Sequence, residues 1–313
     1  EFRVENNGST IPIAFWENTK RYIPEILVYE LMSGQNFKDA RDMVGGRNGL
    51  GVKIVNILSE SFEIFIVNKK CGKVYQQRFE KNADVVHEPI ITKTTKEHVE
   101  SLTRISWKPD YVRLGVALPL DKTIIDMIKT RVYDAAACTA ASVATFFNDK
   151  EICIKTIKDY ALALGGDWVG HEEVKVEKTI ALEYCVCKVS RSEGQHGKCI
   201  GFVNGLQCSA GTHVDLVYRR LIENISEACK KKMKRVCTVR PQSIKDAFIV
   251  VIIANLPNPS FCSQTKDKCD LRVDKFGFTY SALSSQMTKS IAKSGIIEDI
   301  VASFQQQEDK EVS

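Results

Sequence analysis

Short apolar stretches separated by polar turns fill the first third of the chain. Two of them, 62–66 and 74–79, have the composition of strands, and the N-K-K-C-G run between them is typical of a hairpin turn. Residues 103–107 have the same strand-like character, and 1–13 have the pattern of a strand followed by a loop. Apolar residues at helical spacing predict helices over 22–32 and 52–59.

The remainder of the chain alternates longer helical patterns with strand-like runs. The predicted helices are 122–145, 212 to about 235, and 281–304, and the predicted strands are 179–189, 197–204 and a buried strand at 248–255. At the start of the second helix, Thr212 is the expected N-cap and Asp215 the partner in a capping box. The L-G-G-D run at 164–167 interrupts the pattern, so a domain boundary is expected near 155–175. Strands packed under helices indicate an α+β protein.

Length and composition place only broad limits on the number of domains and on the function of the protein. The 313 residues are enough for two domains, and the formal net charge of +5 says little about nucleic acid. No run of eighteen apolar residues occurs, so no transmembrane helix is expected. Eleven cysteines without regular spacing favour a reducing compartment. The chain opens at Glu1 without Met, in what has the pattern of mid-strand, and the expectation is a fragment of a longer protein.

The most informative segment is Gly45–Lys53, G-G-R-N-G-L-G-V-K, which precedes an apolar run suited to the first turns of a helix. Gly46, Gly49 and Gly51 allow the backbone to approach a ligand closely, because glycine tolerates positive φ. A helix N-terminus adds N–H groups and partial positive charge, so the segment would form a phosphate cradle. A plain surface turn is the alternative.

Four further segments carry candidate chemistry. Asn6, in E-N-N-G, would sit near a sugar hydroxyl, a phosphate or a metal-bound water, or would simply form a turn. Residues 33–36 form a polar loop before the glycine segment. Lys266, in S-Q-T-K, would reach a phosphate as a mobile charge, or would be a solvated lysine. The lysine run Lys230–Lys232 would cap a helix dipole or contact DNA phosphates.

Other catalytic classes lack their signatures. The sequence has no G-x-S-x-G, no P-loop ending in G-K-[ST] and no kinase motif set. His171 beside two glutamates, and His213 near Asp215, have no nucleophile at a recognisable turn. A hydrolase of the serine type is therefore not favoured.

Taken in order, these segments resemble the ATPase region of eukaryotic-type (type IIA) DNA topoisomerase II, in the gyrase/Hsp90/histidine-kinase/MutL superfamily. The phrases G-G-R-N-G and S-Q-T-K are the most diagnostic. The matching segments are 5–12 (N-D/N-G-x-G-I-P), 22–25 (Y-[IV]-P-E), 45–53 (G-G-R-N-G-Y-G-A-K), 202–215 (F-V-N-S…G-G-T-H-V) and 258–266 (N-P-x-F-x-S-Q-T-K).

The resemblance implies an α+β fold in two domains. Residues 1–160 would be a Bergerat-type ATPase α/β sandwich without its N-terminal part, and 161–313 a ribosomal-S5-like transducer domain. It implies ATP and Mg²⁺ as cofactors, DNA as partner, a homodimer closed through an ATP gate, and no membrane. It implies a nuclear protein, with an organellar or viral setting as the alternative.

The resemblance also implies residue roles. Lys266 would contact the γ-phosphate from the second domain, Asn6 would lie near Mg²⁺ without binding it directly, and Lys230, Lys231 and Lys232 would touch DNA. The implied nucleotide site comprises Asn6, Gly34, Gln35, Asn36, Gly46, Arg47, Asn48, Gly49, Leu50, Gly51, Val52, Lys53, Gln264, Thr265 and Lys266.

The sequence departs from the family pattern at several places. The E-x-x-x-N-A-x-D helix with the family's general base is absent from these residues, so the chain alone is expected not to hydrolyse ATP. Ser9-Thr10 replaces x-Gly, and Gly34-Gln35 replaces Ser-Ser. The favoured hypothesis is part of a type II topoisomerase, which passes one duplex through a break in another. The alternative is a degenerate nucleotide- or DNA-binding module. A chaperone or mismatch-repair ATPase is disfavoured by the S-Q-T-K loop.

Overall fold

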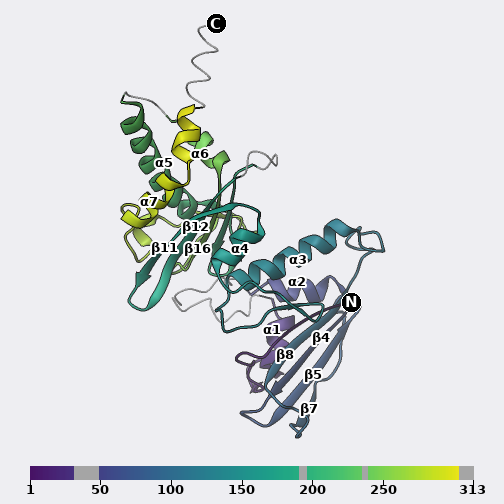
Figure 1. The fold of residues 1–313 in the computed structure, drawn as a ribbon. Coiled ribbons are helices and arrows are strands. Elements are labelled where there is room, and N and C mark those ends of the chain that lie inside the picture. The colour runs from purple at the N-terminus through teal and green to yellow at the C-terminus, as the bar shows by residue number, and fades with distance from the viewer. Residues whose placement is uncertain (32–48, 190–195, 235–238, 303–313) are drawn as a thin grey trace. The chain divides into compact units, whose positions relative to one another are not determined.

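The computed structural model describes residues 1–31, 49–189, 196–234 and 239–302. They form two compact units, the first with residues up to Ile124 and the second with residues from Ile125 onward (Figure 1). Each unit has its own sheet and its own helices, and each is described by itself. The expected α+β class is confirmed.

Unit 1 is built on a six-stranded sheet in the order β1-β8-β4-β5-β6, with β7 also paired to β5. The pairings described in this sheet are all antiparallel. The predicted hairpin at 68–72 is confirmed as the β4–β5 connection. The elements are β1 (Phe2–Asn6), β2 (Phe15–Trp16), β3 (Arg21–Tyr22), α1 (Ile23–Tyr29), α2 (Gly51–Ile57), β4 (Ser59–Asn68), β5 (Lys73–Glu80), β6 (Val85–Val86), β7 (Ile90–Lys93) and β8 (Leu102–Pro109).

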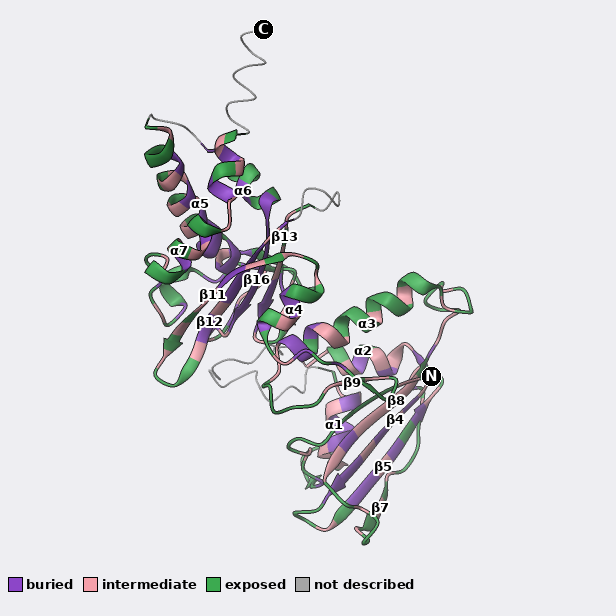
Figure 2. Ribbon diagram, in the orientation of Figure 1, coloured by how far each residue is buried: buried purple, intermediate pink, exposed green. Residues whose placement is uncertain are grey.

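The core of unit 1 lies between one face of this sheet and helices α1 and α2. Figure 2 shows buried stretches along the strands of this sheet. Phe62, Ile64 and Ile66 alternate along β4 and are at most 1% exposed. They share a cluster with Val28 of α1, and Val55 of α2 packs against it. Burying such side chains contributes about 1.5–3 kcal/mol each, so this layer fixes the start of α2 against the sheet.

Unit 2 contains a five-stranded sheet in the order β11-β12-β16-β13-β14, in which the β13–β16 pairing is parallel and the others are antiparallel. The predicted central strand at 248–255 is confirmed as β16. The elements are α3 (Lys122–Ala137), β9 (Phe146–Phe147), β10 (Lys150–Glu151), α4 (Ile157–Ala163), β11 (Asp167–Val176), β12 (Thr179–Lys188), β13 (Lys198–Val203), β14 (Leu206–Gln207), β15 (Ala210–Gly211), α5 (Thr212–Met233), α6 (Pro241–Ala247), β16 (Phe248–Ala254), β17 (Lys268–Cys269), a 3₁₀ turn (Val273–Lys275) and α7 (Ser285–Lys293).

Strand β16 is buried at every position because helices cover both faces of the sheet. Val250 and Ile252 point into a core shared with α5, α6 and α7. Val251 and Ile253 point into a second core, shared with α4 and the last turn of α3. Figure 1 shows α5 and α7 on one side of this sheet and α4 on the other.

Three predictions about helices are wrong in detail. The helix expected to reach 145 ends at Ala137. The helix expected over 281–304 is interrupted, because α7 ends at Lys293 and Gly295 takes a φ of +76° before 296–302 become helical again. The expected capping box at Thr212 does not form, since its hydroxyl donates instead to the carbonyl oxygen of Leu271 at 2.7 Å.

The second core also bears on domain organisation. A capping box that the sequence analysis missed, between Thr156 and Asp159, begins α4. Buried residues of this region, including Ile157 and Tyr160, belong to the core of unit 2. The predicted domain boundary between 160 and 161 falls inside α4 and stays a prediction, while the compact units divide after Ile124.

Across the described ranges, no helix combines the length and the hydropathy that crossing a bilayer requires.

Candidate functional site

The described part of the glycine segment forms the entry to α2. Gly49 takes a φ of +56°, a conformation that glycine adopts without strain. Leu50 is the N-cap, and the first hydrogen bond of the helix runs from the Ile54 N–H to the Leu50 carbonyl at 3.0 Å. A Cβ added to Gly51 would meet no described atom within 4 Å. Among the described residues, no side chain or backbone crowds Gly51 in the first turn.

Lys53, in the first turn of α2, is buried with 1% of its surface exposed. Burial lowers the pKa of its ammonium group, and the charge of Glu30, at the end of α1, acts in the opposite direction. Glu30 is also ion-paired with Arg21 at 3.6 Å. The negative charge of Glu30 thus partly offsets the cost of burying the Lys53 ammonium group.

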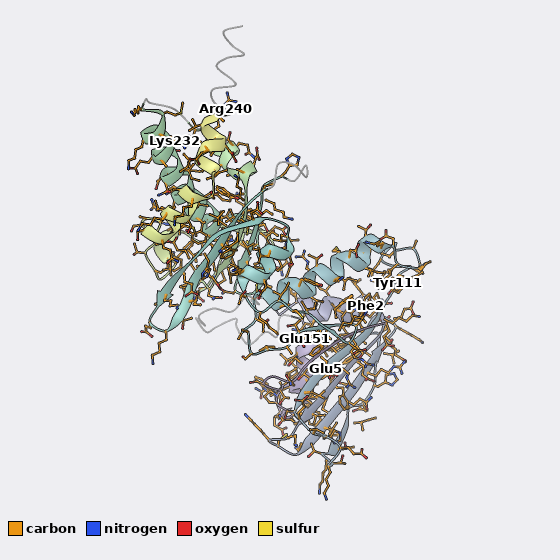
Figure 3. All side chains as sticks on the ribbon, in the orientation of Figure 1. Phe2, Glu5, Tyr111, Glu151, Lys232 and Arg240 are labelled. Atoms are coloured by element: carbon orange, nitrogen blue, oxygen red, sulfur yellow. The ribbon has the colours of Figure 1, made fainter. Side chains whose placement is uncertain are left out.

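The two asparagines after β1 have different surroundings. Asn7 donates from Nδ2 to a carboxylate oxygen of Glu100 at 2.9 Å, a partner that the sequence analysis missed. Asn6 is the exposed last residue of β1, and its Oδ1 lies 3.7 Å from the position of a Cβ on Gly8. The preceding Glu5, labelled in Figure 3, accepts a hydrogen bond from Arg104 at 2.6 Å.

In unit 2, the S-Q-T-K segment is the tip of a small hairpin. An antiparallel bridge joins Phe261 to Cys269. Below it, the Asp270 N–H donates to the Ser260 carbonyl at 3.1 Å, and above it the Cys262 N–H donates to the Lys268 carbonyl at 3.0 Å. These bonds place 263–267 at the outer end of a two-stranded stem.

The tip itself is held by short local contacts. The Lys266 N–H donates to the Ser263 carbonyl at 3.2 Å, and Thr265 donates from its hydroxyl to Asp267 at 2.5 Å. Lys266 takes a φ of +62°, and its Nζ lies 5.9 Å from the ring centre of Phe261. Burial lowers the pKa of the Lys266 ammonium. Gln264 and Thr265 are exposed, so the tip presents an amide, a hydroxyl and a partly desolvated cation together.

The hairpin stem is tied to the start of α5. Gly211, in β15, pairs with Cys269 of β17 in a parallel bridge. Its φ is +115°, and a Cβ there would lie 2.0 Å from the Cys269 carbonyl oxygen. Glycine is required at this position, and through it the hairpin packs directly on the helix that follows.

The three lysines predicted to contact DNA lie exposed in the last turn of α5. Lys232 is labelled in Figure 3. Lys231 forms an ion pair with Glu227 at 2.7 Å, and Lys232 forms one with Glu298. Lys230 has no ion pair within the described residues. Carboxylates therefore partly neutralise two of these three lysines.

Part of the predicted site lies outside the described residues, namely Gly34, Gln35, Asn36, Gly46, Arg47 and Asn48. Asn6 and the α2 entry belong to unit 1, whereas Gln264, Thr265 and Lys266 belong to unit 2. The approach of these two groups to one nucleotide stays a prediction.

Comparisons with known proteins agree on one family. The family model described as DNA gyrase B matches residues 145–312. DNA topoisomerase 2 of Arabidopsis thaliana is 33% identical over 314 residues, which cover 98% of this chain and 21% of that protein. The chain thus spans about a fifth of the length of this curated relative.

Solved structures give the same result. The ATPase region of Saccharomyces cerevisiae topoisomerase II matches with a TM-score of 0.81 at 27% identity, covering 97% of this chain and 76% of that one. The ATPase and transducer domains of Balamuthia mandrillaris topoisomerase II match with a TM-score of 0.84 at 26% identity, covering 98% and 77%. The similarity therefore extends across both units.

Proposed function

Because the chain belongs to the DNA gyrase B family and corresponds to a topoisomerase II ATPase region, we propose that it is the ATP-binding and energy-transducing part of a type II DNA topoisomerase. The whole enzyme would pass one DNA duplex through a transient double-strand break in another.

Unit 1 would hold the nucleotide. The entry to α2, from Gly49 to Lys53, would offer backbone N–H groups to the phosphates, and no described atom lies within 4 Å of the position of a Cβ on Gly51. Asn6 would lie near Mg²⁺, whose preferred ligands are oxygens, and would act through a water. ATP with Mg²⁺ supplies the phosphoanhydride bond whose hydrolysis drives the cycle. The residues described here bind and orient it.

The observation that carries the proposal is the hydrogen-bonded Gln264–Lys266 tip on unit 2. A partly desolvated lysine interacts strongly with a phosphate, because less water screens the charge. Since the tip is braced through Gly211 to α5, gain or loss of the γ-phosphate contact would be transmitted to a 22-residue helix. Hydrolysis would release that contact and let the two units move relative to one another.

The remaining assignments follow from the same proposal. Lys230 would contact DNA phosphates without reading sequence, with weaker contributions from Lys231 and Lys232, which are already paired. ATP binding would close two copies of the protein into a gate around DNA. The eukaryotic relatives support a nuclear location.

Lys266→Ala, introduced into the full-length protein that carries this chain, tests the proposal. We expect a lower ATPase rate and less strand passage, with unchanged DNA binding in the absence of ATP. Lys268→Ala is the matched control, because Lys268 is exposed and lies two residues away in the stem. Equal ATPase rates in wild type and Lys266→Ala would remove the role of this lysine. Nucleotide binding without turnover in the wild type would favour the degenerate module.

A further inference from the structure

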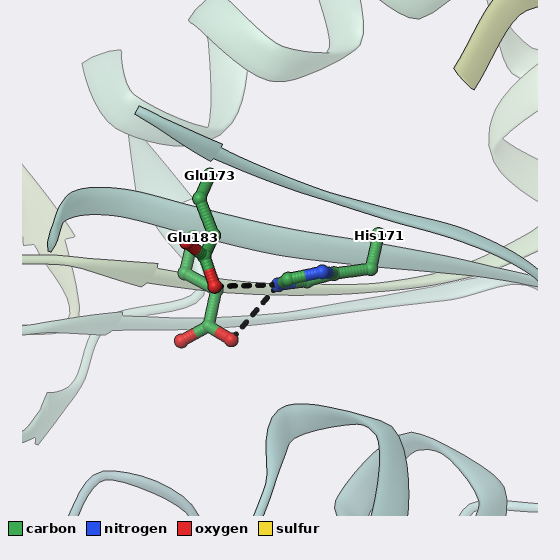
Figure 4. Close-up of side chains that lie close together, drawn as sticks. All are labelled: His171, Glu173 and Glu183. Atoms are coloured by element: carbon green, nitrogen blue, oxygen red, sulfur yellow. Dashed lines mark hydrogen bonds and ion pairs between the residues drawn. The ribbon is translucent and has the colours of Figure 1, made fainter. Parts of the chain in front are cut away.

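A histidine and two glutamates gather on unit 2 in a place that the proposed nucleotide and DNA contacts do not use. His171 Nε2 lies 3.0 Å from an oxygen of Glu183 and 3.7 Å from an oxygen of Glu173 (Figure 4). One ligand atom from each of the three residues lies within 4.8 Å of the other two. We name these three residues the β11–β12 cluster.

The register between strands β11 and β12 brings the three residues of the cluster together. His171 and Glu173 are two residues apart on β11, so they share a face of the sheet. Glu183 lies directly opposite Glu173 on β12. Like charges directly opposite one another destabilise an antiparallel pair. This arrangement therefore gains stability from a positive charge placed between the two carboxylates.

We infer that the β11–β12 cluster binds one divalent transition-metal cation, of which Zn²⁺ is the best fit. The ligands are His171 Nε2 and one oxygen from each of Glu173 and Glu183. Imidazole together with carboxylates is a ligand set that Zn²⁺ takes, whereas Mg²⁺ prefers oxygen alone. Three protein ligands leave a fourth position for water, and the side chains are 31%, 29% and 21% exposed, which gives water access.

The distances suit such an ion. Tetrahedral Zn²⁺, with bonds of about 2.1 Å, separates its ligand atoms by about 3.4 Å. The two separations from His171 Nε2, 3.0 and 3.7 Å, lie on either side of that value. The second oxygen of Glu173 is engaged by Lys175 at 2.7 Å, which leaves the oxygen facing His171 for the metal. Small side-chain shifts would complete the site.

In the structure, Nε2 of His171 forms a hydrogen bond with Glu183. Bonds from both residues to the ion would replace this hydrogen bond. A bound ion would link the two strands of the hairpin that packs against α7, and so stabilise unit 2.

The test is a Zn²⁺ titration of the full chain, labelled with ¹⁵N at its five histidines. We expect the ring signals of His171, assigned with His171→Asn, to shift at one equivalent of Zn²⁺. Calorimetry should show at least tenfold weaker binding at this site in both His171→Asn and Glu183→Gln. Zn²⁺ should also raise the melting temperature of wild type more than that of either variant.

His87 provides the matched control. Its Nε2 lies 3.0 Å from Glu80, the same distance as in the β11–β12 cluster, but the second neighbour of Glu80 is Arg78 instead of another carboxylate. His87→Asn should leave Zn²⁺ binding unchanged. The inference is overturned if the His171 signals of wild type do not respond to Zn²⁺, or if millimolar Mg²⁺ abolishes the response. The wild-type spectrum decides the outcome even if a variant fails to fold.

Discussion

The hydroxyl of Tyr280 donates a hydrogen bond of 2.7 Å to the carboxylate of Glu172, and this bond joins residues 108 positions apart. Tyr184, directly across the hairpin from Glu172, donates to the same oxygen, and the Ser284 N–H donates to the other. One carboxylate on β11 thus holds the segment that leads into α7.

Glu172→Gln should destabilise unit 2 by about 1–3 kcal/mol at pH 7, because an amide cannot accept all three bonds. Burial would raise the pKa of Glu172, but the bonds from Ser284, Tyr184 and Tyr280 outweigh it and lower the pKa. The stabilisation is then complete above the ordinary carboxyl pKa and is lost as pH falls through the lowered value.

Urea unfolding at pH 7 and in the acid range measures this effect. Glu177→Gln, at an exposed glutamate between β11 and β12, is the control and should change little. A Glu172→Gln variant as stable as wild type at pH 7 would contradict the assignment.

We expect a second pH dependence from His213, which is a buried base, whereas Glu172 is a hydrogen-bonded acid. It is fully buried, donates from Nε2 to the Cys208 carbonyl at 2.8 Å, and burial lowers its pKa to about 4. Below pH 6.5 the unfolded chain binds a proton that the folded chain does not, so stability falls as pH falls toward 4. Between pH 7 and pH 5 the loss should be about 2 kcal/mol.

The variant His213→Gln keeps a donor for Cys208 but does not titrate. Its free energy of unfolding should lack this part of the slope between pH 7 and pH 5. Parallel pH profiles for wild type and variant would show that folding does not lower the pKa of His213.

Alanine substitutions at two glycines with positive φ distinguish the effect of a steric clash from the effect of backbone strain. Gly211→Ala should destabilise unit 2 by about 3 kcal/mol or more, because its Cβ would overlap the Cys269 carbonyl in addition to the cost of positive φ. Gly205→Ala, at a φ of +77° with no described atom within 4 Å, should cost only about 1–2 kcal/mol. Denaturant unfolding of both variants checks the order, and equal losses would argue against the close approach of the two strands.

Lys230 should dominate the salt dependence of DNA binding by the α5 end. Lys230→Ala is expected to reduce the slope of log affinity against log salt concentration by about 1. Lys231→Ala should reduce it less, because Glu227 already neutralises that lysine. Binding isotherms at several salt concentrations distinguish the two, and a larger effect for Lys231 would place the DNA elsewhere.

Patterns within single elements could be predicted from the sequence. The continuous apolar run of β16 and the hairpin after β4 are both confirmed, because burial and turn chemistry are local properties. The helix predicted from 212 is also confirmed, but the predicted N-cap at Thr212 is wrong. Thr212 bonds to Leu271, which is 59 residues away, and Gly211 occupies the N-cap. Long-range partners of this kind leave no periodic signal.

In the candidate site too, local motifs could be predicted from the sequence, whereas long-range contacts could not. The glycine segment and the S-Q-T-K turn are contiguous motifs, so their positions were predictable. The effect of Glu30 on the pKa of Lys53, and the ion pair of Lys232 with Glu298, depend on how the helices pack. The β11–β12 cluster depends on register, because Glu183 lies opposite Glu173 only in the folded hairpin.

We propose that this chain is the ATP-binding part of a type II topoisomerase. The most direct measurement is decatenation of linked DNA circles by the full-length protein, with ATP and with a non-hydrolysable analogue. We expect repeated turnover with ATP and at most a single passage with the analogue. Absence of decatenation by well-folded protein that still binds nucleotide would contradict the account.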